Sequence, residues 1–540
     1  MKMRIIKDQG ASMVDIERKL PIGIQDFEKI RNEGFLYVDK TEYIHSLVQS
    51  GAPFFLSRPR RFGKSLFLST LKAYFEGKKE LFEGLKIREL EDGKEDAWRE
   101  YPVFYIDFNK KNFKANSALE AVLDEHVRSW EALYGDQRSG RSLEERFRYV
   151  IEKAVEATGK KAVVLVDEYD KPLLEGADED MVEHNKAVFK GFFSTLKSYD
   201  GYLKFVFITG VTKFSKVSIF SDLNQLRDIS LSAEYAQICG ITETEIKESF
   251  VPEIKAMAAA QGIDEDECLL KLKKMYDGYH FHQGAQGVYN PFSLLNALIE
   301  KEFGMYWFST GTPTFLIDKL KESGFDAKQI TEGELYANAN VLTDYRYDNP
   351  NPVPLFYQTG YLTIKGYDRK YMSYQLDYPN DEVRYGFLNS LAPTYLQDEE
   401  SPNPLDIRSC GMDIEKGKTD SLRDRFTALF ARLPYPNDEN IVEQNFQNVI
   451  YIVFMLLGQY TQTEVHSAKG RADCIVETND YVYVFEFKRD STADEAIKQI
   501  EEMGYAKPYS ADARKLIKIG VNFDSKERNL DGWKVVTGKE

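Results

Sequence analysis

The chain has 540 residues, enough for about two to four domains. Its formal net charge of −16 argues against a nonspecific grip on nucleic acid along the whole chain, although it leaves room for a local basic groove. The four cysteines form no CxxC pair, so neither a zinc site nor a disulfide framework is expected. No apolar run reaches 18 residues and no signal-peptide pattern is present, which favours a cytoplasmic protein without a membrane segment.

Residues 1–15 lack apolar clusters and are expected to form a flexible tail. From there to residue 235, short apolar runs alternate with segments of helical period. The runs predict strands at 35–38, 54–56, 102–108, 161–168 and 203–208, and the segments predict helices at 25–32, 40–49, 66–76, 117–133, 143–157 and 186–196. This alternation is typical of βαβ units, so we expect an α/β domain over residues 16–235, with a parallel sheet covered on both faces. Ligands of such sheets bind beyond the carboxyl ends of the strands.

The remaining chain changes character three times. Residues 236–310 are mainly helical, with helices predicted at 243–260, 265–276 and 293–299, and we expect a small lid subdomain. Residues 311–396 are mixed, and strands at 361–364 and 371–376 would pair around a turn at 366–368, as in a winged-helix wing. Residues 397–430 are expected to be a linker region, most clearly at 397–404. A second, smaller α/β domain is expected over residues 431–540. The helices predicted in and just before it are 421–431, 444–457 and 493–503, and the predicted strands are 472–476, 481–488, 516–521 and 533–536.

A phosphate-binding loop is predicted between the strand at 54–56 and the helix that follows it. Its residues are Arg60-Arg61-Phe62-Gly63-Lys64-Ser65. Backbone N–H groups would cradle phosphate oxygens, Lys64 would reach the β- and γ-phosphates, and the Ser65 hydroxyl would bind Mg²⁺. The usual signature has a glycine five residues before Gly63, where this chain has Arg58. The arginines of this stretch either neutralise phosphate or pair with surface carboxylates, and the sequence leaves both open.

Two carboxylates, Asp167 and Glu168, follow an apolar strand about 100 residues after the loop. Asp167 is placed to accept a hydrogen bond from water on Mg²⁺, and Glu168 to polarise the water that attacks the γ-phosphate. The alternative is a strand that merely ends in a polar turn. Thr209 and Thr212 follow the next strand, where a hydroxyl can sense the γ-phosphate or simply cap a turn.

A second acidic group lies near the C-terminus. Glu486 and Lys488 share one face of an otherwise apolar strand, and Asp473 begins the preceding strand. Two carboxylates can bind Mg²⁺ or Mn²⁺, while Lys488 positions water or stabilises a pentavalent phosphate. Gln499 and Glu443 are candidate outer members of this site. The alternative is a structural ion pair between Glu486 and Lys488.

Long stretches of the chain resemble bacterial proteins that join an AAA-ATPase-like domain to a C-terminal nuclease domain of the PD-(D/E)xK superfamily. The stretches that support this resemblance are LPIGIQDFEKI, SRPRRFGKSLFLSTLKAYFEG, VVLVDEYDKPL, ITGVTKFSKVSIFSDLNQL, YDGYHF, YWFSTGTPTFL, EQNFQNVIY, RADCIVE with FEFK, and AIKQIEEMGYAKPY. The resemblance implies ATP binding by residues 60–65 with Asp167 and Glu168. It also implies a nuclease-type core made of Asp473, Glu486, Lys488 and Gln499.

The leading hypothesis is an ATP-dependent switch, in which the nucleotide state of the first domain regulates a metal-dependent nuclease acting on DNA or RNA. An alternative is a nucleotide-regulated binding or scaffold protein whose nuclease fold is catalytically silent. A third is an ATPase that forms homo-oligomers through its helical subdomain. Arg227 is the candidate arginine finger for such an assembly.

Overall fold

The computed structural model describes residues 18–110, 112–115, 117–135, 141–176, 179–214, 226–310, 316–317, 320, 335–343, 351–395, 406–431, 449–450, 452–458, 464–466 and 474–538. The chain divides into two compact units. The first contains Met1–Thr310 and Ala337–Tyr374, and the second contains Gly311–Tyr336 and Gln375–Glu540. The boundaries expected from the sequence at 236, 311, 397 and 431 stay predictions.

The first unit is built around a five-stranded parallel sheet. Its order is β2 (Val103–Asp107), β3 (Ala162–Asp167), β4 (Leu203–Gly210), β1 (Phe54–Ser57) and β5 (Arg227–Asp228). Every residue of β3 is buried, as expected for an apolar run covered on both faces. The predicted parallel α/β sheet is therefore confirmed.

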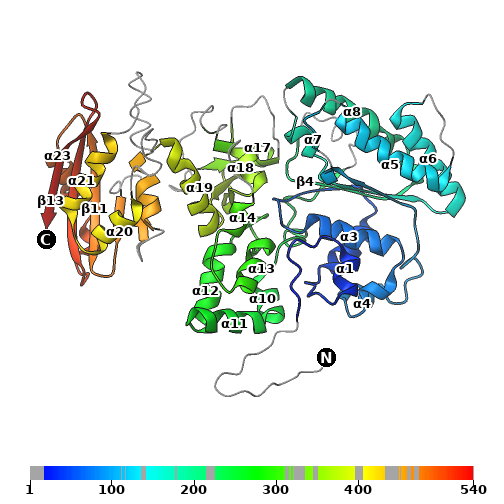
Figure 1. Cartoon of the computed structure of the whole chain (residues 1–540), viewed down its shortest axis with the longest axis horizontal. Coiled ribbons are helices and arrows are strands. Elements are labelled where there is room, and N and C mark those ends of the chain that lie inside the picture. Colours follow the sequence, from blue (N-terminus) through cyan, green and yellow to red (C-terminus); the bar gives the residue numbers. More distant parts are fainter. Residues whose placement is uncertain are drawn as a thin grey trace, which may run out of the picture. The chain divides into compact units, whose positions relative to one another are not determined.

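Helices cover both faces of this sheet. Figure 1 shows α5, α6 and α8 on one side and α1, α3 and α4 on the other. The helices and short 3₁₀ turns of this part are α1 (Phe27–Asn32), α2 (Thr41–Ser50), α3 (Lys64–Phe75), η1 (Lys79–Phe82), α4 (Lys86–Leu90), η2 (Phe108–Lys110), α5 (Ala118–Tyr134), α6 (Leu143–Thr158), α7 (Lys171–Leu174), α8 (Glu179–Ser198) and η3 (Asp200–Tyr202). The strand predicted at 35–38 is wrong, because only Phe35 pairs, in an isolated bridge with Lys19.

A helical group follows the sheet. It consists of α10 (Glu243–Ser249), α11 (Val251–Gln261), α12 (Glu265–Tyr276), α13 (Pro291–Glu300) and α14 (Tyr306–Ser309). The single helix predicted at 243–260 is wrong, because the chain breaks at Phe250. Pro252 lies in the first turn of α11, where its missing N–H costs no helical hydrogen bond, whereas in a continuous helix it would cost one.

Residues 337–374 belong again to the first unit. They include α17 (Ala339–Thr343) and α18 (Val353–Thr359). Strand β7 (Thr363–Asp368) lies beside β8 (Ser373–Asp377) in a small sheet of order β6-β8-β7, where β6 is Tyr336–Ala337. The predicted hairpin is present, but residues 366–368 belong to β7. The turn lies at 369–372, because the Asp368 carboxylate accepts the backbone N–H groups of Lys370 and Tyr371.

The second unit contains a mixed five-stranded sheet of order β13-β12-β11-β10-β9. Strand β11 runs parallel to β12 and antiparallel to β10, and β12 runs antiparallel to β13. The elements are α19 (Asp381–Tyr395), α20 (Ile407–Glu415), α21 (Thr419–Phe430), β9 (Glu464–His466), β10 (Cys474–Glu477), β11 (Tyr481–Arg489), α23 (Ala493–Glu502), η4 (Lys507–Tyr509), β12 (Lys515–Asp524) and β13 (Asn529–Thr537). The predicted small α/β domain is confirmed, while the linker predicted at 397–404 lies outside the described residues.

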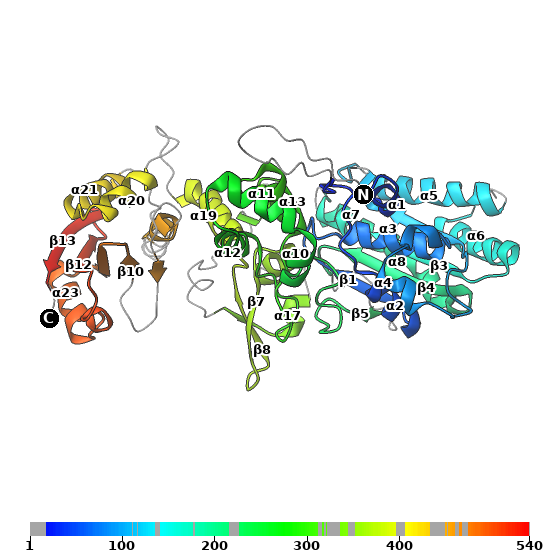
Figure 2. The same ribbon diagram turned by 90° about the horizontal axis from the view of Figure 1, so that it is seen from below.

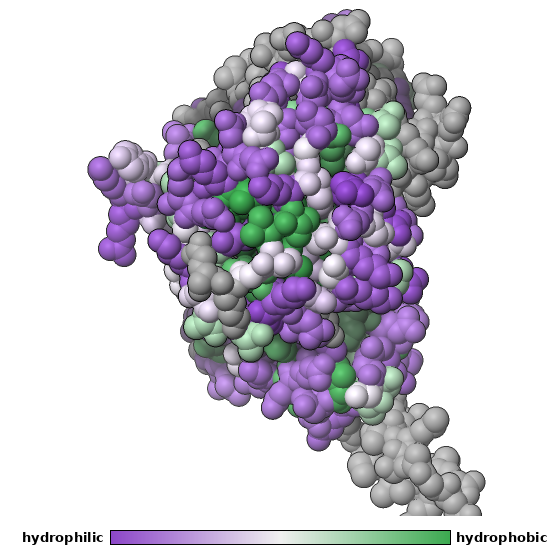
Figure 3. Space-filling view, turned by 90° about the vertical axis from the view of Figure 1, so that its left-hand side faces the viewer, coloured by the Kyte–Doolittle hydropathy of each residue, from purple (hydrophilic) through white to green (hydrophobic). Residues whose placement is uncertain are grey.

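The two faces of β11 pack against different partners. Tyr483 and Phe485 join the core with α20 and α21, whereas Val482 and Val484 pack with Ile497 of α23. Helix α23 connects β11 to β12 and lies against Gly520, where a Cβ atom would come closer than 3.0 Å to the Ala493 carbonyl oxygen. Figure 3 shows the surface at this end of the chain, which is mostly hydrophilic, with its most continuous apolar area near the middle of the view.

Candidate functional site

The loop between β1 and α3, predicted to bind phosphate, turns sharply before the helix. Gly63 has a φ of 94° and Arg61 a φ of 66°, both in the left-handed region. The turn leads directly into α3, which begins at Lys64 and runs for 12 residues. The first N–H groups of a helix have no partner within the helix, so this terminus suits an anion.

Lys64 is a buried cation at the end of the loop. Its Nζ donates to the carbonyl oxygens of Arg58 at 2.8 Å and Pro59 at 3.0 Å. Burial lowers the pKa of Lys64, while the carboxylates of Glu168 and Asp167 act to raise it. Lys64 therefore closes the loop on itself and faces the acidic end of β3.

Asp167 ends β3 and is only 1% exposed. It accepts a hydrogen bond from the Thr209 hydroxyl at 2.8 Å, and the Ser65 side chain lies close enough to influence its pKa. Burial raises the pKa of Asp167, and these two hydroxyls act to lower it. The structure therefore brings together three predicted residues from β3, α3 and β4.

Glu168 follows with a φ of 52°, a left-handed conformation that is unusual for a residue other than glycine. This turn of the backbone sets Glu168 among the residues that line the cavity described below. Non-glycine residues are kept in this region only where the surrounding structure imposes it, and such positions are common at active sites.

Asp170 is a buried carboxylate that the sequence reasoning missed. It accepts the backbone N–H of Val211 at 3.1 Å and both the N–H and the hydroxyl of Thr212, at 2.6 and 2.7 Å. The Thr212 hydroxyl is therefore directed at Asp170, which leaves Thr209 as the threonine beside Asp167. The only indication of Asp170 in the sequence was its position as a third carboxylate, three residues after Asp167.

Arg58 neither faces phosphate nor pairs with a surface carboxylate, so neither interpretation of its side chain holds. It is 1% exposed, and its guanidinium donates to the carbonyl oxygens of Ser57, Ser230 and Tyr235. The guanidinium also lies 3.9 Å from the ring centroid of Phe281. Burial lowers the pKa of Arg58. Its role is to tie the loop to the chain after β5.

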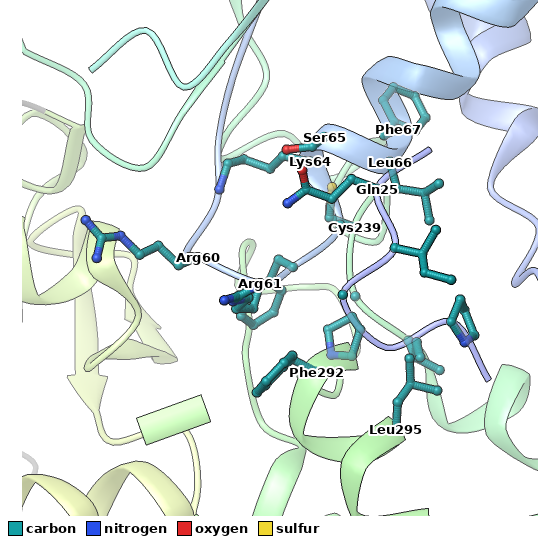
Figure 4. Close-up of a pocket in the computed structure, with 18 of the residues that line it drawn as sticks. Gln25, Arg60, Arg61, Lys64, Ser65, Leu66, Phe67, Cys239, Phe292 and Leu295 are labelled. Carbon is teal, nitrogen blue, oxygen red and sulfur yellow. The ribbon is translucent and has the colours of Figure 1, made fainter. Parts of the chain in front are cut away.

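The neighbouring loop residues contact the helical group. Figure 4 shows Arg60 pointing away from the other labelled side chains and Arg61 lying beside Phe292, and the Arg61 guanidinium is 5.0 Å from the ring centroid of Phe292. The Trp307 Nε1–H donates to the Arg60 carbonyl at 3.1 Å. Phe62 packs edge-on against Tyr279, with ring centroids 4.7 Å apart.

A cavity of about 540 Å³ lies over the loop (Figure 4). Its polar side contains Lys64, Ser65 and Glu168. Its apolar side comes from the N-terminal segment and the helical group, and is lined by Pro21, Ile24, Leu36, Val38, Ile241, Phe250, Phe292 and Leu295. A charged side next to an apolar side suits a nucleotide, whose base and phosphates differ in the same way. Arg227 does not line this cavity.

In the second unit, Glu486, Lys488 and Gln499 form one hydrogen-bonded group. Lys488 Nζ donates to Glu486 Oε1 at 3.2 Å and to Gln499 Oε1 at 2.5 Å, and the Gln499 amide donates to Glu486. Glu486 is only 2% exposed, whereas a quarter of the Lys488 side chain is accessible. The structural ion pair between Glu486 and Lys488 is therefore present. Gln499, which the nuclease hypothesis placed in the site, is hydrogen-bonded to both residues.

The other predicted members of this site, Asp473 and Glu443, lie outside the described residues. Cys474, which follows Asp473, pairs with Phe485, which precedes Glu486. Within the described ranges, no three His, Cys, Asp or Glu side chains are grouped closely enough to hold a metal ion. Among the helices of those ranges, none is both long and apolar enough to cross a bilayer.

Comparisons with known proteins find two domain models and one full-length relative. A model described as predicted AAA-ATPase matches residues 21–220, and one described as PD-(D/E)XK nuclease superfamily matches residues 441–533. An uncharacterized protein in the vnfD 5'region of Azotobacter chroococcum mcd 1 is 36% identical over 535 residues, which is 96% of this chain and 99% of the relative.

Among solved structures, the Aeropyrum pernix ORC1 protein in complex with DNA matches 65% of this chain and 91% of its own chain. The sequence identity is 9% and the TM-score is 0.24. A likeness this loose supports no argument about the site.

Proposed function

This chain belongs to the family of proteins that join a predicted AAA-ATPase domain to a C-terminal domain of the PD-(D/E)XK nuclease superfamily, and from that premise we propose an ATP-regulated nuclease. The first domain binds and hydrolyses ATP. Its nucleotide state regulates a metal-dependent site in the second domain, which acts on nucleic acid.

The observation that supports ATP binding best is the turn through Arg61 and Gly63, which places Lys64 and Ser65 with Glu168 along a cavity large enough for a nucleotide. Ser65 and Asp167 would hold Mg²⁺, which neutralises phosphate charge when bound. Lys64 exchanges its two carbonyl partners for phosphate oxygens. Glu168 orients and polarises the attacking water, and Thr209 holds the Asp167 carboxylate in place.

The proposal for the second domain rests on the hydrogen bonds that join Glu486 and Lys488 of β11 to Gln499 of α23. Asp473 and Glu486 would hold Mg²⁺ or Mn²⁺, which activates water and stabilises a pentavalent phosphate. Lys488 positions the phosphate that is cut, and Gln499 fixes the direction of Lys488.

The ATPase proposal is tested by measuring phosphate release from ATP. We expect activity in the wild type, little in Lys64→Ala, and in Glu168→Gln a rate about 10²–10⁴-fold lower with nucleotide binding retained, because only the water-polarising group is lost. Glu179→Gln, an exposed position on α8, is the control and should hydrolyse ATP normally. A wild type no faster than Lys64→Ala would overturn the proposal.

The nuclease proposal is tested on plasmid, single-stranded DNA and RNA with Mg²⁺ or Mn²⁺, with and without ATP. Cleavage should be lost in Glu486→Gln and Lys488→Ala but kept in Lys498→Ala, whose side chain on α23 is 71% exposed. Regulation by ATP requires that the effect of ATP disappear in Lys64→Ala. Absence of cleavage on every substrate would remove the nuclease half.

The second candidate function is a nucleotide-regulated binding or scaffold protein with a silent nuclease fold. It is favoured by the mutual hydrogen bonding of Glu486, Lys488 and Gln499, which satisfies the carboxylate without a metal. Calorimetric titration with Mn²⁺ separates the two. Binding that Asp473→Asn and Glu486→Gln abolish supports the nuclease, and heat that is unchanged by both variants supports the scaffold.

A further inference from the structure

The turn between β7 and β8 presents four exposed side chains in a row. They are Arg369, Lys370, Tyr371 and Met372, which we call the hairpin tip. Tyr371 is 68% exposed and Met372 is 69% exposed. Figure 2 shows the hairpin extending away from the helices near its base, so the tip is open to a large partner.

The tip has a defined conformation. Asp368 Oδ1 accepts the N–H of Lys370 at 2.8 Å and of Tyr371 at 3.1 Å, which fixes the turn. The rings of Tyr367 and Tyr374 lie 4.9 Å apart below the tip and brace the two strands. A surface ordered before binding loses little conformational entropy when a partner binds.

The chemistry of the tip combines positive charge with a flat ring. Arg369 and Lys370 supply two cations, and the one adjacent carboxylate, Asp368, is hydrogen-bonded to the turn backbone. Lys370 Nζ lies 4.9 Å from the ring centroid of Tyr371. This local excess of positive charge stands out in a chain whose net charge is −16.

We propose that the hairpin tip is a nucleic-acid contact. Arg369 and Lys370 bind phosphates, while Tyr371 and Met372 stack on or wedge between bases. A two-stranded ribbon fits the major groove of DNA, and the six residues of β7 span roughly 20 Å, enough to reach into it. A site for a protein partner would be favoured by a broader apolar surface than two side chains flanked by cations.

The hairpin-tip proposal rests on the proposed function only for its ligand class, nucleic acid. The test distinguishes failure of the hairpin-tip proposal from failure of the proposed function. Binding of labelled duplex DNA, single-stranded DNA and duplex RNA to the full chain is measured by fluorescence anisotropy in EDTA without ATP, over a range of salt concentrations. Because neither metal nor nucleotide is present, the result is independent of hydrolysis and cleavage. The three ligands show which form of nucleic acid the tip prefers.

We expect Arg369→Ala/Lys370→Ala to weaken binding by tenfold or more at low salt and to reduce the salt slope by about 2, one for each lost phosphate contact. Tyr371→Ala should weaken binding by roughly fivefold or more through lost stacking. The control is Lys271→Ala/Lys274→Ala, which removes two exposed cations from α12 and should leave affinity within about twofold of the wild type.

The proposal is overturned if the wild type binds none of the three ligands, or if the tip variants bind with unchanged affinity and salt slope. Tip-independent binding together with cleavage would remove this inference and leave the proposed function standing. Binding that depends on the tip, in a protein that does not hydrolyse ATP, would support this inference and remove the ATPase half of the proposed function. All tip positions are exposed, so thermal melting of each variant should match the wild type and exclude unfolding as the cause of a loss.

Discussion

Arg58 occupies the position where a phosphate-binding loop usually has its first glycine, and its buried guanidinium donates to three backbone carbonyl oxygens. Arg58 has no positive φ, so a glycine is not required there, and the side chain instead ties the start of the loop to distant backbone groups. Two of those carbonyls belong to Ser230 and Tyr235, more than 170 residues away. At the residue scale, the loop is therefore stabilised by long-range contacts.

We expect Arg58→Met to lower the free energy of unfolding by about 3 kcal/mol or more, because several charged hydrogen bonds are lost and their carbonyls stay buried. Urea unfolding measures this change. Arg61→Met is the control, since Arg61 is exposed and its main contact is the ring of Phe292. Equal stability of the two variants would show that the Arg58 hydrogen bonds contribute little.

At the scale of elements, α10 and α12 are joined by one carboxylate. Glu243 accepts a hydrogen bond of 2.6 Å from Lys247 on its own helix and another of 2.6 Å from Lys273 on α12. These hydrogen bonds lower the pKa of Glu243 from 4.5 to about 2. The side chain is 36% exposed, so water screens the pair, and about 0.5–1 kcal/mol of stability is a fair expectation.

The lowered pKa of Glu243 predicts how this stability depends on pH. The contribution is fully present above the ordinary pKa of 4.5 and is lost as the pH falls through about 2. Wild type and Glu243→Gln should therefore differ in urea midpoint at pH 6 to 7 and converge toward pH 2. Added salt should shrink the difference, and Glu248→Gln on the same helix should show none of it. A difference that grows on acidification would contradict the assignment.

At the scale of the whole molecule, a ligand that binds one folded domain should raise the free energy of unfolding of that domain. ATP with Mg²⁺ at about 100 times its Kd should raise the free energy of unfolding by about 2.7 kcal/mol, because only the folded domain binds it. Thermal melting with increasing ATP measures this. The shift should be lost in Lys64→Ala and retained in Lys488→Ala, and the opposite pattern would place the nucleotide in the second domain.

Local sequence patterns predicted the elements well where one interaction dominates. Strands β1 and β3 were predicted to within a residue or two, because a strand buried on both faces must be a continuous apolar run. Predictions were wrong where a single local feature competes with the pattern. Pro252 divided one predicted helix into two, and the Asp368 carboxylate placed the hairpin turn after residues 366–368, where it had been predicted.

The sequence by itself determined the α/β architecture of both domains and singled out Lys64, Ser65 and Asp167 as candidate site residues, because these follow from short motifs and from periodicity. Only the tertiary structure decided that Asp170 holds Thr212 and that Arg58 is structural. The partners of these buried groups lie about 40 and 170 residues away along the chain, respectively. A buried charge must be satisfied by whatever polar groups the fold brings to it, and no local pattern specifies which groups those are.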